Sequence, residues 1–153
     1  MVSIRPARDT DRDSLVAFNC AMALETEGKT LNSDVVAAGV STLLQRPELG
    51  FYLIAEEGGE ALASLMVTSE WSDWRNGLYW WVQSVYVRPE HRRRGIYRQL
   101  YQAVQQLASE QGDVCGFRLY VEKDNVRAQQ TYRALGMSET VYQMYEQCPP
   151  ARK

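Results

Sequence analysis

Metal-binding and disulfide-forming residues are scarce in this sequence of 153 residues. It contains one histidine, His91, and three cysteines, Cys20, Cys115 and Cys148. The cysteines are odd in number and far apart, and none belongs to a CxxC or Cys/His spacing of the kind that binds zinc. We therefore expect free thiols and no bound metal, and the position of His91 within a basic loop disfavours a Cys–His catalytic pair.

Long hydrophobic runs are also missing. No apolar stretch approaches the ~18–20 residues that cross a membrane as a helix, and charged residues occupy the N-terminal positions where a signal peptide has its apolar core. Hydrophobic residues make up 45% of the chain and charged residues 24%, which is ordinary for a globular protein. We expect a cytoplasmic protein that forms a single domain over residues 1–153, with no membrane partner.

A large excess of one charge is absent too, since the net charge is −2. Against this background the segment 88–98 is strongly basic, and its cationic residues are Arg88, His91, Arg92, Arg93, Arg94 and Arg98. Six residues do not make the broad basic face that nucleic acid requires, so we expect no nucleic-acid partner. A solvated basic loop and a site for a small polyphosphate remain as alternatives, and the elements around the segment favour the polyphosphate.

Hydrophobic periodicity, together with glycine and proline positions, predicts strands and helices in the order β-α-α-β-β-β-α-β-α-β. The predicted strands cover residues 2–7, 50–55, 61–68, 78–87, 117–122 and 141–146. The predicted helices run from Asp9 or Thr10 to about Leu24, from Ser33 to about Gln45, from Ile96 to Gln111 and from Asn125 to Leu135. Ser33 is the expected cap of the second helix.

The most informative segment runs from Trp80 to Leu100. It reads as a buried strand, a turn at Pro89, and the sequence Arg92-Arg93-Arg94-Gly95 at the start of an amphipathic helix. Unpaired N–H groups and the positive end of the helix dipole favour phosphate at such a point. The segment has neither the GxxxxGK[ST] of a P-loop nor the GxGxxG of a dinucleotide fold.

A second segment follows the strand at 117–122. Asn125 and Ala128 are three residues apart, and Ala128 and Tyr132 are four apart, so all three lie on one face of the predicted helix. The helix is then expected to end at Gly136, the usual place for a C-terminal glycine.

Both segments resemble motifs of the GCN5-related N-acetyltransferases, the GNAT family. The first is similar to the pyrophosphate-binding motif Arg/Gln-x-x-Gly-x-Gly/Ala, with Tyr97 where a small residue is usual. The second is similar to N-x-x-A-x-x-x-Y-x-x-x-GF, with Met137 in place of Phe. The resemblance implies an α/β (α+β) fold with a mixed, mostly antiparallel central sheet flanked by helices. It also implies that the sheet is splayed between the fourth strand (78–87) and the fifth (117–122).

The resemblance further implies an acetyl-CoA-dependent N-acetyltransferase in which an amine of a small molecule or of a protein attacks directly in a ternary complex. Acetyl-CoA would be bound by residues from the fourth strand, the arginine loop and the last helix: Val85, Tyr86, Val87, Arg92, Arg93, Arg94, Gly95, Ile96, Tyr97, Arg98, Asn125, Ala128 and Tyr132. Tyr132 would protonate the departing thiolate. The alternative is a non-catalytic domain that binds acyl-CoA as a sensor or partner-binding module, which the departure at Tyr97 keeps open.

The acceptor side is less specific in the sequence. A carboxylate is expected to take the proton of the amine, and Glu25, Glu27 and Glu70 are the candidate bases, although each also reads as an exposed acid. We expect Gln83, Trp71 and Asp73 to contact the acceptor, and the nearby acids hint at a cationic acceptor such as a polyamine, an aminoglycoside or a lysine side chain. Trp71 and Trp74 fit a homodimer contact equally well.

Overall fold

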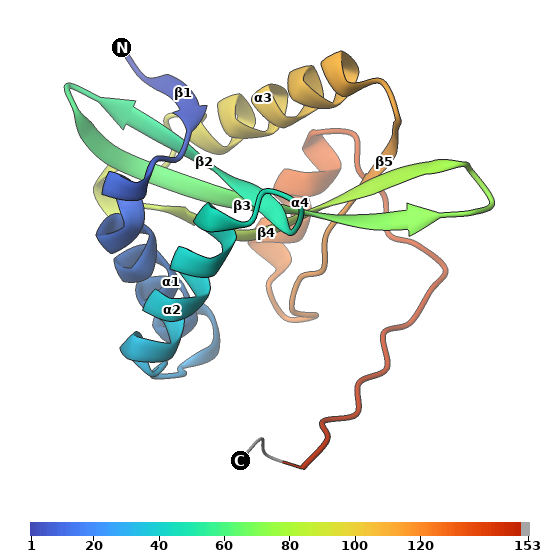
Figure 1. The fold of residues 1–153 in the computed structure, drawn as a ribbon, viewed down its shortest axis with the longest axis horizontal. Coiled ribbons are helices and arrows are strands. Elements are labelled where there is room, and N and C mark those ends of the chain that lie inside the picture. The colour runs from blue at the N-terminus through green and yellow to red at the C-terminus, as the bar shows by residue number, and fades with distance from the viewer. Residues whose placement is uncertain (151–153) are drawn as a thin grey trace. The chain divides into compact units, whose positions relative to one another are not determined.

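The computed structural model describes residues 1–150, and its contacts divide the chain into two compact units, Met1–Tyr120 and Val121–Lys153. The first unit contains a five-stranded sheet in the order β1-β2-β3-β4-β5 (Figure 1). The strands are β1 (Ser3–Pro6), β2 (Gly50–Glu57), β3 (Glu60–Ser72), β4 (Gly77–Val87) and β5 (Val114–Arg118). Neighbouring strands from β1 to β4 are antiparallel, and β5 is parallel to β4. The predicted mixed, mostly antiparallel sheet is confirmed.

Three helices of the first unit flank this sheet: α1 (Arg12–Glu27), α2 (Ser33–Gln45) and α3 (Ile96–Gln111). On β2, Tyr52 and Ile54 pack with Leu15 of α1 and Val40 of α2 in one core cluster. Side chains alternate along a strand, so Leu53 between them faces the opposite side, where α3 buries its apolar stripe. The sheet is therefore covered by α1 and α2 on one face and by α3 on the other.

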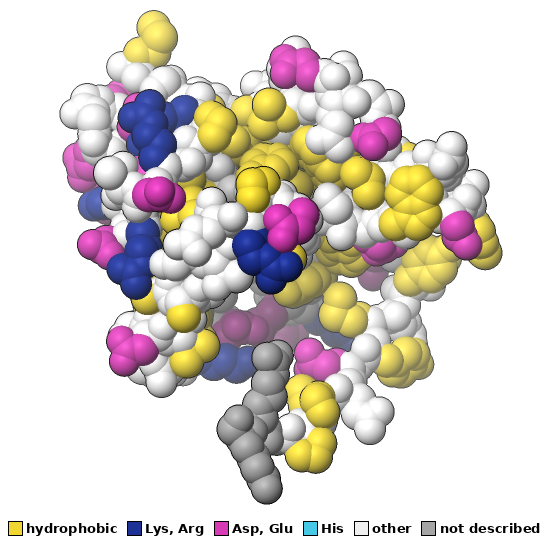
Figure 2. All heavy atoms as spheres, viewed as in Figure 1, with side chains coloured by type: hydrophobic (Ala, Val, Ile, Leu, Met, Phe, Trp, Pro, Cys, Tyr) yellow, Lys and Arg dark blue, Asp and Glu magenta, His cyan; other side chains and the backbone are white. Residues whose placement is uncertain are grey.

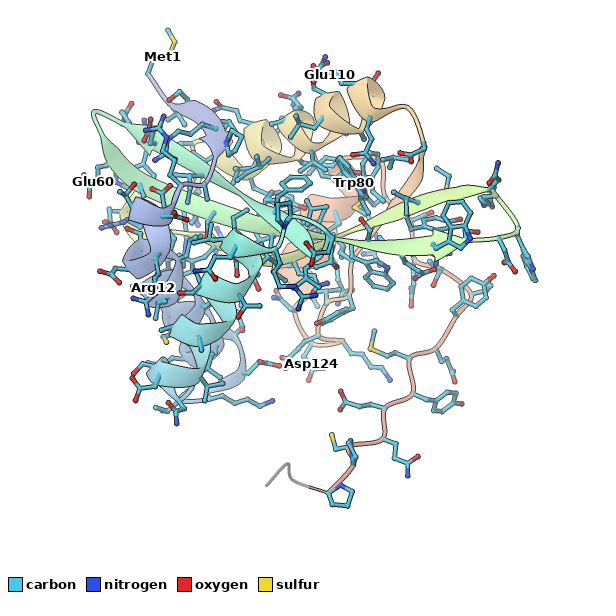
Figure 3. The ribbon with its side chains drawn as sticks, in the orientation of Figure 1. Met1, Arg12, Glu60, Trp80, Glu110 and Asp124 are labelled. Carbon is cyan, nitrogen blue, oxygen red and sulfur yellow. The ribbon has the colours of Figure 1, made fainter. Side chains whose placement is uncertain are left out.

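Trp80 and Trp81 show the same alternation on β4. Trp80 is 3% exposed and its ring meets Phe51 edge-on at 5.3 Å, near the middle of the sheet in Figure 3. Trp81 points to the other face, where its indole N–H donates to Glu70. One tryptophan of this pair therefore belongs to the core, and the other lies on the opposite face of the sheet.

The structure corrects several helix boundaries. Asn32, not Ser33, caps α2, because its side chain accepts from the N–H groups of Asp34 and Val35. The helix α1 continues past Leu24 to Glu27 and ends at Gly28, which adopts the left-handed conformation with φ 63°. Glu25 consequently lies on the last turn of α1 and not in a connecting loop.

The predicted strand at 141–146 is wrong. The described residues from 137 to 150 form neither helix nor strand, and Val141 and Tyr145 are 93% and 89% exposed. An apolar segment of high strand propensity becomes a strand when a partner edge satisfies its backbone, and no such pairing is present within residues 1–150. The second unit contains the helix α4 (Val126–Ala134).

The strand expected at 117–122 begins earlier than predicted, at Val114, and ends at Arg118. Among the described residues, it pairs with β4 only from Leu78 to Trp81. From Val82 to Val87 the β4 strand keeps its partner β3 on one side but has no β5 partner on the other. This divergence is the splay that the family resemblance implied.

Charged side chains are mixed over the surface. On the face shown in Figure 2, Lys and Arg side chains lie among Asp and Glu side chains and do not form one broad basic area. No helix within residues 1–150 is long and apolar enough to cross a membrane.

Candidate active site

A β-bulge interrupts β4 where the strand separates from β5. Gln83 is opposite Met66 and Tyr86 is opposite Ser64, so Ser84 and Val85 together face the single residue Leu65. Ser84 has φ 51°, a left-handed conformation that is uncommon for serine. Bulges and strained backbone of this kind are frequent beside functional sites because they redirect the strand and its polar groups. The sequence around Ser84 contains no glycine or asparagine that would have predicted it.

The loop after β4 delivers the chain to the N-terminus of α3. A short 3-10 turn, Pro89–His91, is followed by Arg93 and Gly95, both left-handed with φ 64° and 72°. Gly95 is the N-cap of α3 and carries no side chain, so no side-chain oxygen caps the first turn. An uncapped helix start behind a loop of this shape binds anions through its N–H groups and its dipole.

Two arginines of this loop are bound within the protein. Arg92 donates from Nε to the Val87 carbonyl at 2.9 Å and from Nη2 to Glu25 Oε2 at 2.6 Å. Arg94 contacts Glu57 at 3.1 Å and the ring nitrogen Nδ1 of His91 at 2.9 Å. Within residues 1–150, Arg93 and Arg98 form no ion pair, so their charges remain available for a bound anion.

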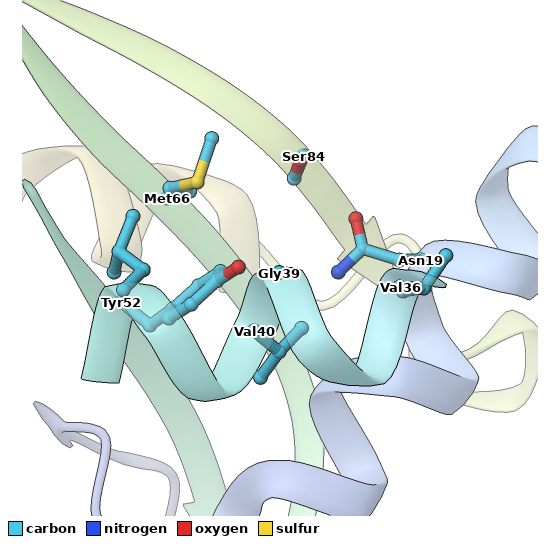
Figure 4. Close-up of a pocket in the computed structure, with 8 residues that line it drawn as sticks. Asn19, Val36, Gly39, Val40, Tyr52, Met66 and Ser84 are labelled. Atoms are coloured by element: carbon cyan, nitrogen blue, oxygen red, sulfur yellow. The ribbon is translucent and has the colours of Figure 1, made fainter. Parts of the chain in front are cut away.

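A cavity of about 280 Å³ opens between α1, α2 and the strands β2, β3 and β4 (Figure 4). Its lining residues are Asn19, Val36, Gly39, Val40, Leu43, Tyr52, Met66 and Ser84. Ser84 is the bulge residue, so the cavity reaches β4 at the point where that strand loses its β5 partner. A pocket, a strand edge without a β5 partner and an uncapped helix start therefore follow one another along β4 and the loop after it.

Comparison with known proteins agrees with this arrangement. The acetyltransferase (GNAT) family profile matches residues 20–137, which is most of the chain. The chain belongs to the GNAT family. No curated protein matches the sequence.

Solved structures of other acetyltransferases share the GNAT fold of this chain. A possible acetyltransferase from Clostridium difficile 630 is 42% identical, with 99% of each chain covered and a TM-score of 0.93. A predicted acetyltransferase from Clostridium acetobutylicum, solved with acetyl-CoA, is 19% identical, with 96% of each chain covered and a TM-score of 0.80. The aminoglycoside N-acetyltransferase AAC(6')-Iy, solved with CoA, is 19% identical, with coverage of 97% of this chain and 95% of that one and a TM-score of 0.80.

Tyr97 occupies the position where GNAT proteins usually have a small residue. Its ring stacks on Tyr101 with centroids 6.3 Å apart, and Tyr101 meets Phe117 of β5 at 5.8 Å. The tyrosine thus belongs to a row of aromatic rings along α3. The large residue is accommodated by packing within the fold.

The three candidate bases lie outside the cavity lining. Glu25 accepts from Arg92 and, at 3.4 Å, from the Tyr86 hydroxyl. Glu70 accepts from Arg118 at 2.9 Å and from the Trp81 indole at 3.0 Å. Glu27 is exposed and lies 3.9 Å from Lys29. In Glu25 and Glu70, these donors occupy the carboxylate oxygens that a general base would use.

The predicted acceptor contacts are also separate from the cavity lining. Gln83 lies on the same face of the sheet as Met66, and its amide donates to Thr68 Oγ1 at 2.6 Å. Trp71 and Asp73 lie at the far end of the β3–β4 hairpin, where Trp71 is 59% exposed. The lining residues Asn19, Tyr52 and Ser84 were not found from the sequence, since each looks like an ordinary helix or strand position.

The second unit holds the other GNAT motif. Asn125 caps α4 by accepting from the N–H of Ala128 at 3.2 Å, which accounts for an asparagine at this position. Tyr132 is half-buried, and burial raises the pKa of its hydroxyl above the ordinary value. Gly136 follows the helix in the left-handed conformation, as predicted.

Proposed function

We propose that this GNAT protein is an N-acetyltransferase that transfers an acetyl group from acetyl-CoA to a small amine. The observation that carries the proposal is the separation of β4 from β5 beyond Trp81, immediately before an uncapped helix N-terminus. A free strand edge and an anion site in sequence suit a ligand that has amides at one end and a pyrophosphate at the other.

The residues present fit acetyl-CoA. The β4 edge from Val82 to Val87, which has no β5 partner, offers the groups that would pair with the pantetheine amides in the manner of an added strand. The start of α3 would hold the pyrophosphate, with Arg93 and Arg98 adding positive charge. Val85, Tyr86 and Val87 serve through their backbone, because the Tyr86 ring is buried against Phe18.

Transfer forms a bond between the amine nitrogen and the acetyl carbon and breaks the bond between that carbon and the CoA sulfur. The amine gives up one proton, and the departing thiolate takes one up. Holding the amine and the thioester side by side supplies much of the acceleration. A backbone N–H near Val85 is the assigned donor to the carbonyl oxygen as it gains negative charge.

Tyr132 is the proposed general acid. The raised pKa of its hydroxyl keeps the proton in place at neutral pH, which an acid must retain until the thiolate leaves. Removal of the amine proton is assigned to Glu27 acting through water, because Arg92 and Arg118 hold the carboxylates of Glu25 and Glu70 and none of the three acids lines the cavity.

The first test is calorimetric titration of acetyl-CoA into the protein and into Gly95→Asp. A Cβ at Gly95 meets no atom within 4 Å, although φ 72° strains any side chain there, so the effect of charge is taken from the difference between this variant and a control with the same strain. Gly112→Asp is the matched control, since Gly112 is left-handed and equally open at the other end of α3. Binding that is lost in Gly95→Asp and kept in Gly112→Asp supports the cofactor site.

The second test measures CoA release with a panel of amines. Steady thiol release in the presence of an amine supports the transferase. Acetyl-CoA binding without release for any amine favours the alternative, a domain that binds acyl-CoA without catalysis. Equal acetyl-CoA affinity in all three proteins would contradict the assigned cofactor site.

A further inference from the structure

The cavity beside Ser84 has a chemical character that narrows the acceptor. Five of its lining residues are apolar or aromatic: Val36, Val40, Leu43, Tyr52 and Met66. No carboxylate and no cation is among the lining residues. The cavity is open on one side, so a group that lies in it contacts hydrocarbon on its inner face, and the lining offers no charge to compensate a second ammonium group.

Three polar groups border the same space. Figure 4 shows the hydroxyl of Tyr52, the hydroxyl of Ser84 and the amide of Asn19 directed into the gap between α2 and the strands. The amide nitrogen of Asn19 donates to the Leu15 carbonyl at 2.9 Å, which leaves its carbonyl oxygen turned toward the cavity. An oxygen at Asn19 and one at Ser84 are suited to accept hydrogen bonds from a single bound amine.

The position of Ser84 fixes which end of the acceptor lies where. Ser84 belongs to the stretch of β4 that has no β5 partner. It is also the lining residue nearest in sequence to Val85, the assigned donor to the carbonyl oxygen. The reacting nitrogen must lie at this strand, and the rest of the acceptor then extends toward Tyr52, Val40 and Leu43. The volume of about 280 Å³ lies just below the ~300–1,000 Å³ typical of small-molecule sites, which suits one ring or a short chain.

We infer that the acceptor is a primary amine joined to a single neutral apolar group, an arylalkylamine or short alkylamine, with that group seated in this cavity. The inference rests on the proposed acetyltransferase function and adds the substrate class. It differs from the polyamine, aminoglycoside or lysine side chain that the acids in the sequence suggested as a cationic acceptor. Glu25 and Glu70 are bound to Arg92 and Arg118, and the cavity itself has no acidic residue.

Gly39 provides a variant that tests the cavity without disturbing the fold. It lies within α2 on the cavity wall, and an added Cβ meets no atom within 4 Å. Gly39→Leu therefore fills the space from a helix that accepts the residue. Ala38→Leu is the matched control, because Ala38 is exposed on the same helix and is not part of the lining.

The experiment measures kcat/KM at saturating acetyl-CoA for 2-phenylethylamine, hexylamine, spermidine and kanamycin. We expect the first two to exceed the two polycations by about tenfold or more. In Gly39→Leu, kcat/KM for 2-phenylethylamine should fall about tenfold or more because KM rises. The affinity of Gly39→Leu for acetyl-CoA should stay unchanged, and so should kcat/KM for 2-phenylethylamine in Ala38→Leu.

Faster acetylation of spermidine or kanamycin, or an unaltered KM for 2-phenylethylamine in Gly39→Leu, would overturn the inference and leave the transferase intact. Binding of acetyl-CoA with no acetylation of either apolar amine would overturn it as well. Failure of the wild-type protein to bind acetyl-CoA would instead remove the proposed function, and the substrate class with it.

Discussion

Glu25 Oε2 lies 2.6 Å from Arg92 Nη2, which joins the last turn of α1 to the loop that precedes α3. The same guanidinium donates to the Val87 carbonyl and lies over the Tyr86 ring, 5.6 Å from its centroid. These contacts hold the end of β4 against the loop between β4 and α3. The sequence offered Glu25 as a base, whereas its contacts make it a support for the loop.

Glu25→Gln should therefore weaken the binding of acetyl-CoA more than it alters the pH dependence of kcat. Glutamine keeps the size of the side chain but removes the charge that holds Arg92, and a charge-assisted hydrogen bond contributes about 1.5–3 kcal/mol. We expect the Kd for acetyl-CoA to rise about tenfold. Calorimetry and a pH–rate profile check this, with Glu110→Gln, an exposed acid at the far end of α3, as the control. A kcat that no longer falls at low pH in Glu25→Gln would return the role of general base to Glu25.

The parts of the site that the sequence predicted are those written in consecutive residues. The strand ending before Pro89 and the helix starting after Gly95 can be read locally, because turn chemistry and hydrophobic periodicity are short-range signals. The splay was expected from the family resemblance, which this segment carries. Gly136 as the stop of α4 is a local signal of the same kind.

The parts that the sequence did not predict depend on residues far apart in the chain. The cavity joins Asn19, Tyr52 and Ser84 from three elements, and the bulge at Ser84 arises from how β4 pairs with β3. The strand expected at 141–146 failed for the same reason, since alternating apolar residues indicate strand propensity but not whether an edge is present to pair with. Arg92 and Glu25 are separated by 67 residues, and no local pattern links them.

Arg93→Ala should lower the affinity for acetyl-CoA while leaving the fold unchanged. Arg93 forms no ion pair within the described residues, so its charge serves the anion site and not an internal contact. Loss of one charge-assisted contact corresponds to about tenfold in Kd, or about 1.4 kcal/mol. The loss should shrink as salt is raised, because the interaction is exposed and screened. Arg46→Ala, which removes an arginine paired with Glu48 before β2, is the control and should bind normally.

Tyr132→Phe should reduce kcat by about 100-fold, within the range for loss of a general acid. Phenylalanine keeps the ring and its burial, so the Kd for acetyl-CoA should change little. The rate of amide formation is measured with acetyl-CoA and with a thioester of a more acidic thiol. A better leaving group needs less protonation, so a general acid predicts a smaller loss of rate with the second thioester. An equal loss of rate with both thioesters would assign Tyr132 to packing.

The salt bridge between Arg5 and Asp11 should make the free energy of unfolding depend on pH in the acidic range. Arg5 Nη1 lies 2.7 Å from Asp11 Oδ2, and Arg5 also pairs with Glu56 at 2.9 Å. The hydrogen bond from Arg5 holds the pKa of Asp11 below its ordinary value, against the opposing effect of burial. Because the folded pKa is depressed, this contribution is fully present above about pH 4, the unfolded value, and is lost as pH falls through the folded value.

Asp11→Asn should lower the free energy of unfolding by about 1–3 kcal/mol at pH 7, since Arg5 is left with Glu56 alone in a largely buried position. The deficit should shrink as pH is lowered below about 4, where the wild-type carboxylate becomes protonated and loses its advantage. Urea denaturation at a series of pH values between 2.5 and 7 measures the difference. At neutral pH the midpoint urea concentration should be lower in Asp11→Asn by on the order of 1–2 M. Asp13→Asn, at an exposed site on the first turn of α1, is the control and should show a far smaller, nearly pH-independent effect. A constant difference between Asp11→Asn and the wild type across this range would contradict the assignment.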